Sequence, residues 1–330
     1  MKKVNWLLLI CFTLCAFVMS CKNAEQPKME TVTLRQEWFP YVGYVGEVVA
    51  ADLFAKDEGI ALKVVAGAED IDPIKMVLSG SETFGVVSAD RIIMARAKGA
   101  DVVAIGVINL KSSTCFLTKA ESNITSPQDF LGKKVGILTG TNTEYVYKLL
   151  MKKMGVDRKK IKEMEIPFDL GTFVLGQYDV RPAFIYDEPI SLDEKNIKYN
   201  IIDPTKYGIS FIGTVYFTTG KTLKEKPEVV QKFINALIKG WDYSLKNDDK
   251  AMNSLASYDS KLRKERELNA LRKGKEYYAG KNGKILFSDR EDWERQINYL
   301  VELDVLKKDQ SVKVDDVFTN KFVEAYYSKK

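Results

Sequence analysis

The chain has 330 residues, and its 50 lysine and arginine residues exceed its 45 aspartate and glutamate residues, for a formal net charge of +5 at pH 7. This small excess is spread along the chain without a block of like charges, so the charge pattern gives no support to nucleic-acid binding. Histidine is absent, which excludes Ser-His and Cys-His triads, zinc sites built on imidazole, and acid–base catalysis by histidine.

The first 20 residues have the organisation of a secretory signal peptide. Two lysines precede an apolar stretch from residue 6 to residue 19, which is shorter than the ~20 residues that a helix needs to cross a bilayer. Cys21 follows the small residue Ser20, an arrangement similar to the bacterial lipobox, in which the cysteine receives the lipids. We expect residues 1–20 to be removed, Cys21 to be lipidated, and residues 21–30 to form a tether. The alternative is an ordinary signal peptide with an incidental cysteine.

Processing of this kind leaves a single cysteine in the mature chain. Cys11 and Cys15 lie in the leader and Cys21 would be capped by lipid, so Cys115 has no partner for an intramolecular disulfide. Cys115 stands in an apolar run at residues 113–117, and we predict a buried small hydrophobe rather than a nucleophile.

Strand and helix patterns alternate from residue 31 to about residue 117. Val45, Val48, Val49 and Leu53 recur at helical spacing before Gly59, which is typical of a helix end. Further helices are expected from Asp72-Pro73 and over 90–98, and strands at 31–34, 60–65, 83–87 and 102–107.

A second unit of the same type begins near Ser126. A short helix is expected after Ser126-Pro127, and Thr141 with Glu144 has the spacing of a capping box that opens a helix to Met154. Strands are expected at 134–138, 161–166, 182–185, 200–202 and 211–218. From Pro227 onward the pattern is mainly helical, with an apolar stripe over 230–241 and another helix at 293–303.

Strand–helix alternation favours parallel sheets covered on both faces. The two units predict an α/β protein with two similar lobes around a cleft, which is the usual location for a small ligand. We expect residues 31–117 and 215–330 to form the first lobe and residues 118–214 to form the second.

Three stretches could carry binding chemistry. Glu37-Trp38-Phe39-Pro40-Tyr41, with Tyr44 nearby, directly follows the first expected strand. Aromatic residues at the carboxyl end of a parallel strand are well placed to stack on a flat ligand. The alternative is that these rings only pack the strand–helix junction.

The second stretch is Thr139-Gly140-Thr141-Asn142-Thr143, which enters a helix immediately after a strand. Free backbone N–H groups and hydroxyls at such a helix start favour an anion or a carbonyl oxygen. It is not a phosphate-binding loop, because no Gly-Lys-Ser/Thr follows. Ordinary helix capping is the alternative.

The third stretch, Tyr186-Asp187-Glu188-Pro189, lies just past another expected strand. One of its carboxylates could accept hydrogen bonds from an amino or hydroxyl group of a ligand. Adjacent carboxylates normally point apart and no matching second pair is present, so glycosidase chemistry is disfavoured. A solvated turn is the alternative.

The chain as a whole resembles the solute-binding proteins that include aliphatic-sulfonate, taurine and thiamine-pyrimidine-precursor binders. The likeness covers residues 31 to about 326. It is carried by motifs whose order and spacing together are specific: Trp38-x-Pro40, Gly80-x-x-x-Phe84-Gly85, the stretch from Ser126 to Val135, Gly176-Gln-Tyr-Asp179, Glu188-Pro189, Lys226-Pro-Glu-Val-Val230 and Asp316-Val-Phe-Thr-Asn320.

The resemblance implies the type II periplasmic-binding fold, in which two α/β lobes joined by two crossovers close on a ligand by a hinge motion. The partners it implies are a small molecule and an ABC permease with its ATPase, and a monomer is expected. No enzymatic activity, cofactor or metal is expected. The protein would be exported and held by lipid at the cell membrane, facing the periplasm or the cell exterior. The ligand-binding residues that the resemblance implies are Trp38, Ser88, Gly140, Thr141, Asn142, Thr143 and Glu188. Tyr44 and Tyr186 are added on position and chemistry.

The resemblance leaves the ligand open. Aromatic rings around the expected cleft favour a flat heteroaromatic molecule, such as a thiamine pyrimidine precursor or a flavin, and taurine, an alkanesulfonate or another small anion is the alternative. A ligand-sensing lipoprotein without transport is an alternative of another class. The fold also includes enzymes that make the thiamine pyrimidine, which rely on an active-site histidine and a cysteine-rich motif that this chain lacks.

Overall fold

The computed structural model describes residues 29–307, 310 and 312–329. The expected signal peptide and the lipidation site Cys21 lie outside the described residues. In the part of the chain that is described, no helix is both long and apolar enough to span a membrane.

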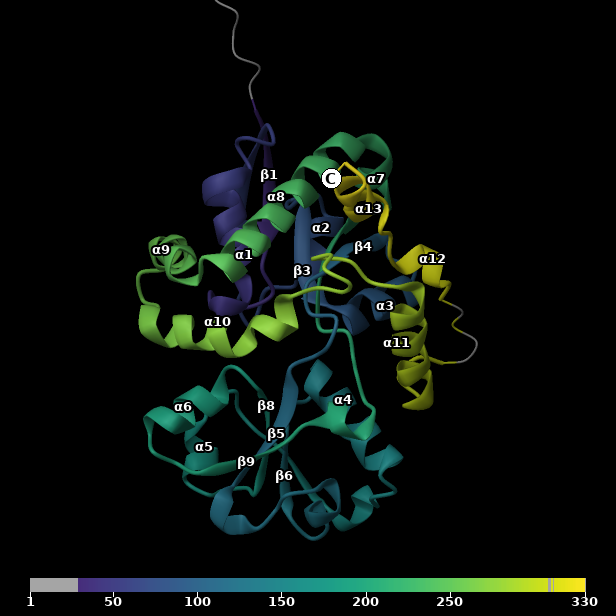
Figure 1. Ribbon diagram of the computed structural model, residues 1–330. Helices are drawn as coiled ribbons and strands as arrows, with labels where there is room; N and C mark the ends of the chain where they lie inside the picture. Colours follow the sequence, from purple (N-terminus) through teal and green to yellow (C-terminus); the bar gives the residue numbers. More distant parts are fainter. Residues whose placement is uncertain (1–28, 308–309, 311, 330) are drawn as a thin grey trace, which may run out of the picture. The chain divides into compact units, whose positions relative to one another are not determined.

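Among the described residues, the strands form two separate five-stranded sheets, which Figure 1 shows as the centres of two α/β bodies. The first sheet has the order β2 (Ile60–Val65), β1 (Glu30–Arg35), β3 (Phe84–Ser88), β10 (Thr214–Thr219) and β4 (Val102–Val107). The second has the order β7 (Lys162–Glu165), β6 (Lys134–Ile137), β8 (Val180–Phe184), β5 (Thr114–Lys119) and β9 (Tyr199–Ile202). The predicted two-lobed α/β architecture is confirmed.

Both sheets are mixed, so the expected parallel pairing is found for only some of the strands. β1 is parallel to β3, whereas β10 is antiparallel to both of its neighbours. In the second sheet β6 is parallel to β7 and β8, whereas β5 is antiparallel to β8 and β9. The antiparallel strands, β10 and β5, are those that directly follow a crossing of the chain from the other sheet. Each is reached through a crossing segment and not through the strand–helix–strand connection that joins parallel strands.

Two segments carry the chain between the sheets, after β4 and before β10. They run side by side: the Gly213 N–H donates to the Asn109 carbonyl at 2.8 Å, and the Ser112 N–H donates to the Phe211 carbonyl at 2.8 Å. The first crossing is complete before Thr114, because β5 pairs entirely within the second sheet. The expected lobe boundary at residue 117 therefore falls inside a second-sheet strand that the sequence pattern missed.

Each sheet separates two apolar cores, as the alternation of side chains along a strand requires. In β3, Phe84 and Val86 face one core and Val87 faces the other. In β5, Phe116 faces one core, and Cys115 and Leu117 face the opposite one. Cys115 is fully buried, which confirms the prediction for this residue.

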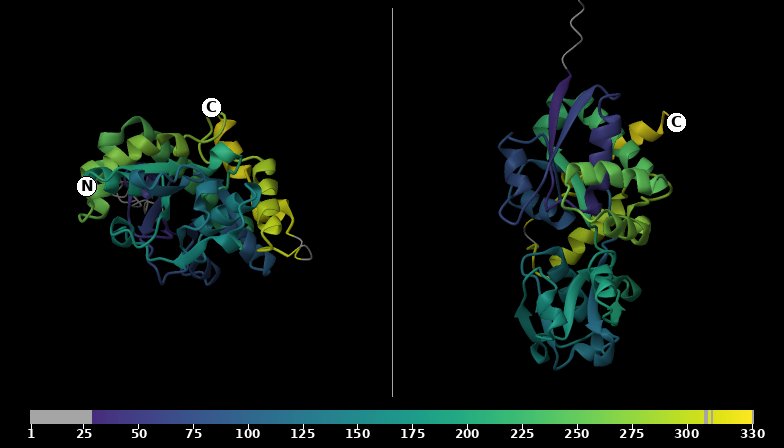
Figure 2. Two further views of the ribbon diagram at one scale, coloured as in Figure 1. Left: turned by 90° about the horizontal axis from the view of Figure 1, so that it is seen from below. Right: turned by 90° about the vertical axis from the view of Figure 1, so that its left-hand side faces the viewer.

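Helices cover both faces of each sheet (Figures 1 and 2). Those associated with the first sheet are α1 (Val45–Val49), α2 (Pro73–Leu78), α3 (Ala89–Ala97), α7 (Gly220–Glu225), α8 (Pro227–Lys246), α9 (Asp248–Tyr258), α10 (Lys264–Tyr278), α11 (Arg290–Glu302), α12 (Val314–Val317) and α13 (Lys321–Tyr327). Those associated with the second sheet are α4 (Asn142–Lys153), α5 (Gly171–Val174) and α6 (Glu188–Glu194).

Local sequence signals account for several helix ends. The Asp72 side chain accepts a hydrogen bond from the Ile74 N–H at 3.1 Å, and Pro73 occupies the first turn of α2. Gly59 has a φ of 77°, which favours glycine after a helix. The helix expected before Gly59 is interrupted, because α1 is followed by a π-helical turn over Ala50–Phe54. A Cβ at Gly240 would lie 2.3 Å from the Gly46 carbonyl oxygen, so glycine is required where α8 crosses α1.

Candidate functional site

The loop after β1 holds Trp38 by its backbone on two sides. The Trp38 N–H donates to the Tyr44 hydroxyl at 3.0 Å, and the Trp38 carbonyl accepts from the Gly67 N–H at 3.0 Å. Tyr44 is only 3 % exposed, and its ring packs edge-on against Tyr41 with centroids 4.9 Å apart. Tyr44 therefore supports the partly buried Trp38, and its own contact with a ligand stays a prediction.

An ionic network joins the loops that follow the first three strands. Arg91, in the first turn of α3, donates to Glu37 at 2.7 Å and to Asp72 at 2.7 Å. Burial raises the pKa of Glu37, and the charge and hydrogen bond of Arg91 act in the opposite direction. The network fixes the loop that carries Trp38 against the start of α3, where Ser88 is the partly exposed N-cap residue. The sequence interpretation did not name Arg91, although its place three residues after the strand end was a usable signal.

The loop before α4 is closed by its own side chains. The Gly140 N–H donates to the Glu144 carboxylate at 2.7 Å, and the Thr141 hydroxyl donates to the Leu138 carbonyl at 2.7 Å. The hydroxyls of Thr141 and Thr143 are 2.7 Å apart. The predicted capping box of Thr141 and Glu144 is wrong in detail, because the Thr141 side chain does not cap the helix and the Glu144 carboxylate reaches past Thr141 to Gly140.

Two contacts bring the loops of the two sheets together. The Asn142 side-chain amide donates to the Asp90 carboxylate at 2.8 Å. The ring of Trp38 packs against that of Phe168, which follows β7, with centroids 4.9 Å apart and an interplanar angle of 48°. Three predicted residues, Trp38, Ser88 and Asn142, thus belong to loops that meet where the two sheets face each other. Phe168 was missed, although it follows an expected strand in the same way as Trp38.

Tyr186 lies at this meeting point but is buried in the core of the first sheet. It is 3 % exposed and packs against Tyr277 and Tyr278 of α10, with centroids 5.8 Å and 5.5 Å away. The structure therefore makes Tyr186 an anchor between the two α/β bodies. Direct stacking of a ligand on Tyr186 stays a prediction.

Glu188 begins α6 and is partly buried. One of its carboxylate oxygens accepts from the Phe184 N–H at 2.8 Å. Burial and the neighbouring charge of Asp187 raise the pKa of Glu188 to about 7, while the Phe184 hydrogen bond and the charge of Arg181 act in the opposite direction. Glu188 can therefore exist near neutral pH both as an acceptor and as a donor of hydrogen bonds.

Ion pairs link α6 to α10, with every acid on the second-sheet side and every base on the first-sheet side. Arg266 pairs with Asp187 and, at 2.9 Å, with Glu267 on its own helix. Two more pairs continue the contact along the helices: Arg263 with Glu194 at 2.8 Å and Lys273 with Asp193 at 2.9 Å. We call these three interhelix pairs the α6–α10 ion pairs.

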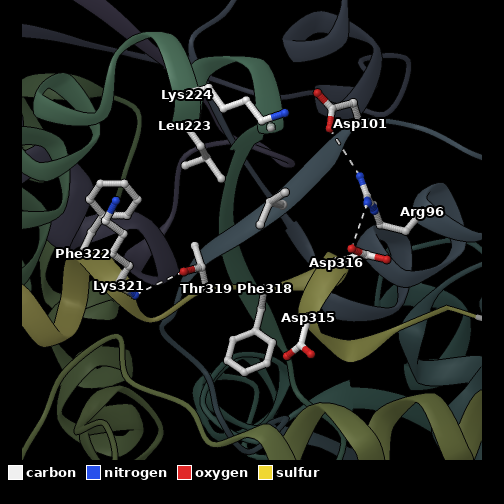
Figure 3. Close-up of a pocket in the computed structure, with 12 residues that line it drawn as sticks. Arg96, Asp101, Leu223, Lys224, Asp315, Asp316, Phe318, Thr319, Lys321 and Phe322 are labelled. Atoms are coloured by element: carbon white, nitrogen blue, oxygen red, sulfur yellow. Dashed lines mark hydrogen bonds and ion pairs between the residues drawn. The ribbon is translucent and has the colours of Figure 1, made fainter.

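Two surface cavities are lined by residues other than those predicted for the site. One of about 320 Å³ is bordered by α7, α12 and α13 at the β4 edge, and Figure 3 shows Arg96 between Asp101 and Asp316 on its rim. The other, of about 200 Å³, is lined by residues near the crossing segments, among them Lys111, Ser210 and Tyr277. None of the predicted site residues lines either cavity. Among the described residues, no three histidine, cysteine, aspartate or glutamate side chains are grouped so that they could hold a metal ion.

The family described as NMT1/THI5 like matches residues 45–251. The chain belongs to this NMT1/THI5-like family. This confirms the family resemblance inferred from the motifs.

The relatives of the chain include both binding proteins and enzymes. A formylaminopyrimidine-binding protein of Halalkalibacterium halodurans is 26% identical over 92% of this chain and 95% of its own. A 4-amino-5-hydroxymethyl-2-methylpyrimidine phosphate synthase of Legionella pneumophila is 23% identical over 88% of this chain and 92% of its own. A riboflavin-binding protein of Chloroflexus aurantiacus is 23% identical over 69% of this chain and 66% of its own.

Solved structures show the same fold. The periplasmic aliphatic sulphonate binding protein of Escherichia coli has a TM-score of 0.70 at 16% identity, covering 87% of this chain and 91% of that chain. The periplasmic nitrate-binding protein of Synechocystis PCC 6803 has a TM-score of 0.72 at 10% identity, covering 92% of this chain and 89% of that chain. The NMT1/THI5-like chain thus has the two-lobed fold of periplasmic binding proteins.

Proposed function

We propose that this chain is the extracytoplasmic solute-binding component of an ABC importer and that it binds a flat heteroaromatic molecule between its two lobes. A pyrimidine precursor of thiamine is the ligand that we favour, and a flavin is the next. The observation that carries the proposal is the meeting of loops from both sheets at Trp38 and Phe168, where two aromatic rings from different lobes are in contact.

The relatives support this class of ligand. A formylaminopyrimidine-binding protein aligns with nearly the whole of this chain, and a riboflavin-binding protein is another relative. Both names describe molecules that contain a flat heteroaromatic ring, whose faces can stack on Trp38. Polar groups on the edge of such a ring can donate to Glu188 or accept from Ser88.

The start of α4 favours a neutral ring over a sulfonate. Glu144 in the first turn of α4 holds its carboxylate against the Gly140 N–H at 2.7 Å, so an anion bound at this helix start would meet a negative charge. A sulfonate oxygen would have to displace this carboxylate and overcome its charge. The side-chain amide of Asn142 is also engaged, with Asp90.

Binding without catalysis is the role that the residues support. Synthases are among the relatives, but the chain has no histidine, and its Cys115 is fully buried with a pKa raised by burial. A thiol in this environment is a poor nucleophile. In the proposed mechanism the lobes close on the ligand about the two crossing segments and the closed form docks on a permease.

The anchor of the proposed protein is a lipid on Cys21. Residues 1–20 support export, and the chain after Cys21 then begins outside the cytoplasm. A Cys21→Ala variant should lose metabolic labelling with a fatty acid in a bacterial host, while a Cys115→Ala variant should keep it. Equal labelling of the Cys21→Ala variant and the unaltered protein would contradict lipidation at this residue.

A thermal-shift screen tests the ligand class. The purified protein would be tested with thiamine pyrimidine precursors, riboflavin, taurine, alkanesulfonates and amino acids, because a ligand that binds only the folded state raises Tm with its concentration. We expect a rise with a pyrimidine or a flavin, and weaker binding in Trp38→Ala and Glu188→Ala variants. A rise with sulfonates alone would overturn the heteroaromatic proposal, and unchanged affinity in both variants would overturn the site.

A further inference from the structure

Phe168 is an exposed aromatic residue that points at the ring of Trp38. It follows β7 of the second sheet, whereas Trp38 follows β1 of the first. Phe168 is 51 % exposed, yet its ring centroid lies 4.9 Å from that of Trp38. Large apolar side chains gain free energy from burial, so an aromatic residue held at the surface beside a second ring is a feature that binding of a third ring would explain.

A buried arginine holds the loop that carries Phe168. Arg181 on β8 is fully buried, and its guanidinium donates to the carbonyls of Phe168 and Pro167, the latter at 3.3 Å. It also donates to the Tyr178 hydroxyl at 2.7 Å. A buried cation held by neutral oxygens is costly compared with an apolar residue of similar size. Its contacts fix the backbone of Phe168 and thereby the position of the ring.

The flanks of the loop are fixed as well. The Ile166 N–H donates to the Ile137 carbonyl at 3.1 Å, which continues the pairing of β6 with β7. The Gly171 N–H donates to the Asp169 side chain at 2.8 Å as α5 begins. The short segment that carries Phe168 is therefore held by hydrogen bonds before and after this residue and by the Arg181 side chain beneath it.

We propose that Phe168 is the second aromatic wall of the ligand site and that Arg181 is its positioning residue, so that a planar aromatic heterocycle is bound between the rings of Trp38 and Phe168. This inference rests on the proposed function and narrows the ligand class to planar rings that can be contacted on both faces. A ring stacked on both sides needs the two walls to be about 7 Å apart, at about 3.5 Å per contact. The present centroid separation of 4.9 Å at an interplanar angle of 48° requires the two rings to move apart by about 2 Å and to turn toward parallel on binding.

Titration calorimetry on the full-length protein tests the wall. The probes are a formylaminopyrimidine, riboflavin and taurine. Phe168→Ala should weaken binding of the ring compound by about ten-fold, whereas Phe168→Tyr should bind within about two-fold of the unaltered protein because it keeps the ring. Leu175→Ala is the matched control, since Leu175 is 77 % exposed on the same lobe and should change nothing.

A double-mutant cycle tests the role of Arg181. Arg181→Lys should weaken ring binding in the unaltered background and have no further effect in the Phe168→Ala background, because Arg181 acts through Phe168. If Arg181→Lys does not fold, Tyr178→Phe removes one acceptor of the guanidinium and serves in the same cycle. Additive losses would show that Arg181 contributes by another route and would overturn its assignment.

The outcomes separate this inference from the proposed function. Ring binding that is unchanged in Phe168→Ala would overturn the second wall and leave the heteroaromatic site on Trp38 intact. Binding of taurine but of neither ring compound would overturn both proposals. A loss confined to ring compounds in Phe168→Ala, with rescue in Phe168→Tyr, is the result that supports the wall.

Discussion

The side-chain amide of Asn142 donates a 2.8 Å hydrogen bond to the carboxylate of Asp90, and this bond joins the N-terminal turns of two helices that follow strands of different sheets. Asp90 is buried, and burial raises its pKa while the Asn142 hydrogen bond acts in the opposite direction. Because each partner belongs to a different α/β body, the bond contributes only when the bodies are together.

Replacing Asn142 by aspartate should therefore disfavour the closed arrangement. The new carboxylate would face Asp90, and repulsion would replace a hydrogen bond to a charged group, which contributes about 1.5–3 kcal/mol. We expect ligand affinity to fall by about ten-fold or more and the radius of gyration from X-ray scattering with ligand to increase. Asn200→Ala is the control, because Asn200 bonds to Thr118 and Ile124 within one lobe. Equal losses of affinity in both variants would contradict a specific role for the Asn142–Asp90 bond.

The α6–α10 ion pairs predict a difference between two arginines of one helix. Arg266 is 16 % exposed and pairs with Asp187 across the lobes, whereas Arg272 is 51 % exposed and pairs with Asp248 and Asp249. Arg266→Ala leaves Asp187 and the buried Glu267 without their cation and should cost about 2 kcal/mol. Arg272→Ala should leave the free energy of unfolding almost unchanged, because exposed ion pairs contribute little. Urea unfolding measures the free energy of unfolding of both variants. Equal losses would show that Arg266 contributes no more to the contact between the lobes than Arg272 contributes to its exposed ion pairs.

Glu47 predicts a pH dependence of stability. It is fully buried on α1, and burial raises its pKa to about 8, against the hydrogen bonds of Gln36 and Tyr216. In the unfolded chain the same carboxyl ionises near its ordinary value of 4.5. Between these two values unfolding releases a proton, so Glu47 lowers stability as pH rises, with a slope of at most about 1.4 kcal/mol per pH unit.

The measurement is the free energy of unfolding of Glu47→Gln relative to the unaltered protein from pH 5 to pH 8. The variant should lose relatively less stability as pH rises, because its side chain cannot ionise. Glu225→Gln, an exposed position on α7, should follow the unaltered protein throughout. Parallel curves for Glu47→Gln and the unaltered protein would mean that Glu47 is already ionised in the fold.

Glu188 predicts a pH dependence of binding. Burial and the charge of Asp187 raise its pKa to about 7, so the carboxylate form is lost as pH falls through this value. A ligand that donates an N–H to the carboxylate should bind about ten-fold more weakly at pH 6 than at pH 8. Calorimetry should show this change in the unaltered protein and in the exposed Glu121→Gln control, and a flat profile in Glu188→Gln. A flat profile in all three proteins would remove Glu188 from the ligand site.

The order and type of the main elements could be predicted from local patterns. Strand alternation, helical spacing and signals such as Asp72-Pro73 or Gly59 depend on residues only a few positions apart, so they are visible in the sequence. The strand Thr114–Lys119 was missed because its apolar run faces two cores, which removes the alternation that marks a half-buried strand.

The sequence by itself determined the absence of histidine chemistry, the α/β class, the two-lobed plan and the family. Only the tertiary structure decided that β5 and β10 are antiparallel, that Tyr186 is an anchor in the first core, and that Phe168 faces Trp38. Local periodicity reflects which face of one element is buried. Which loops meet depends on where the chain crosses between the sheets. The positions of these crossings are determined by packing between residues far apart in the sequence.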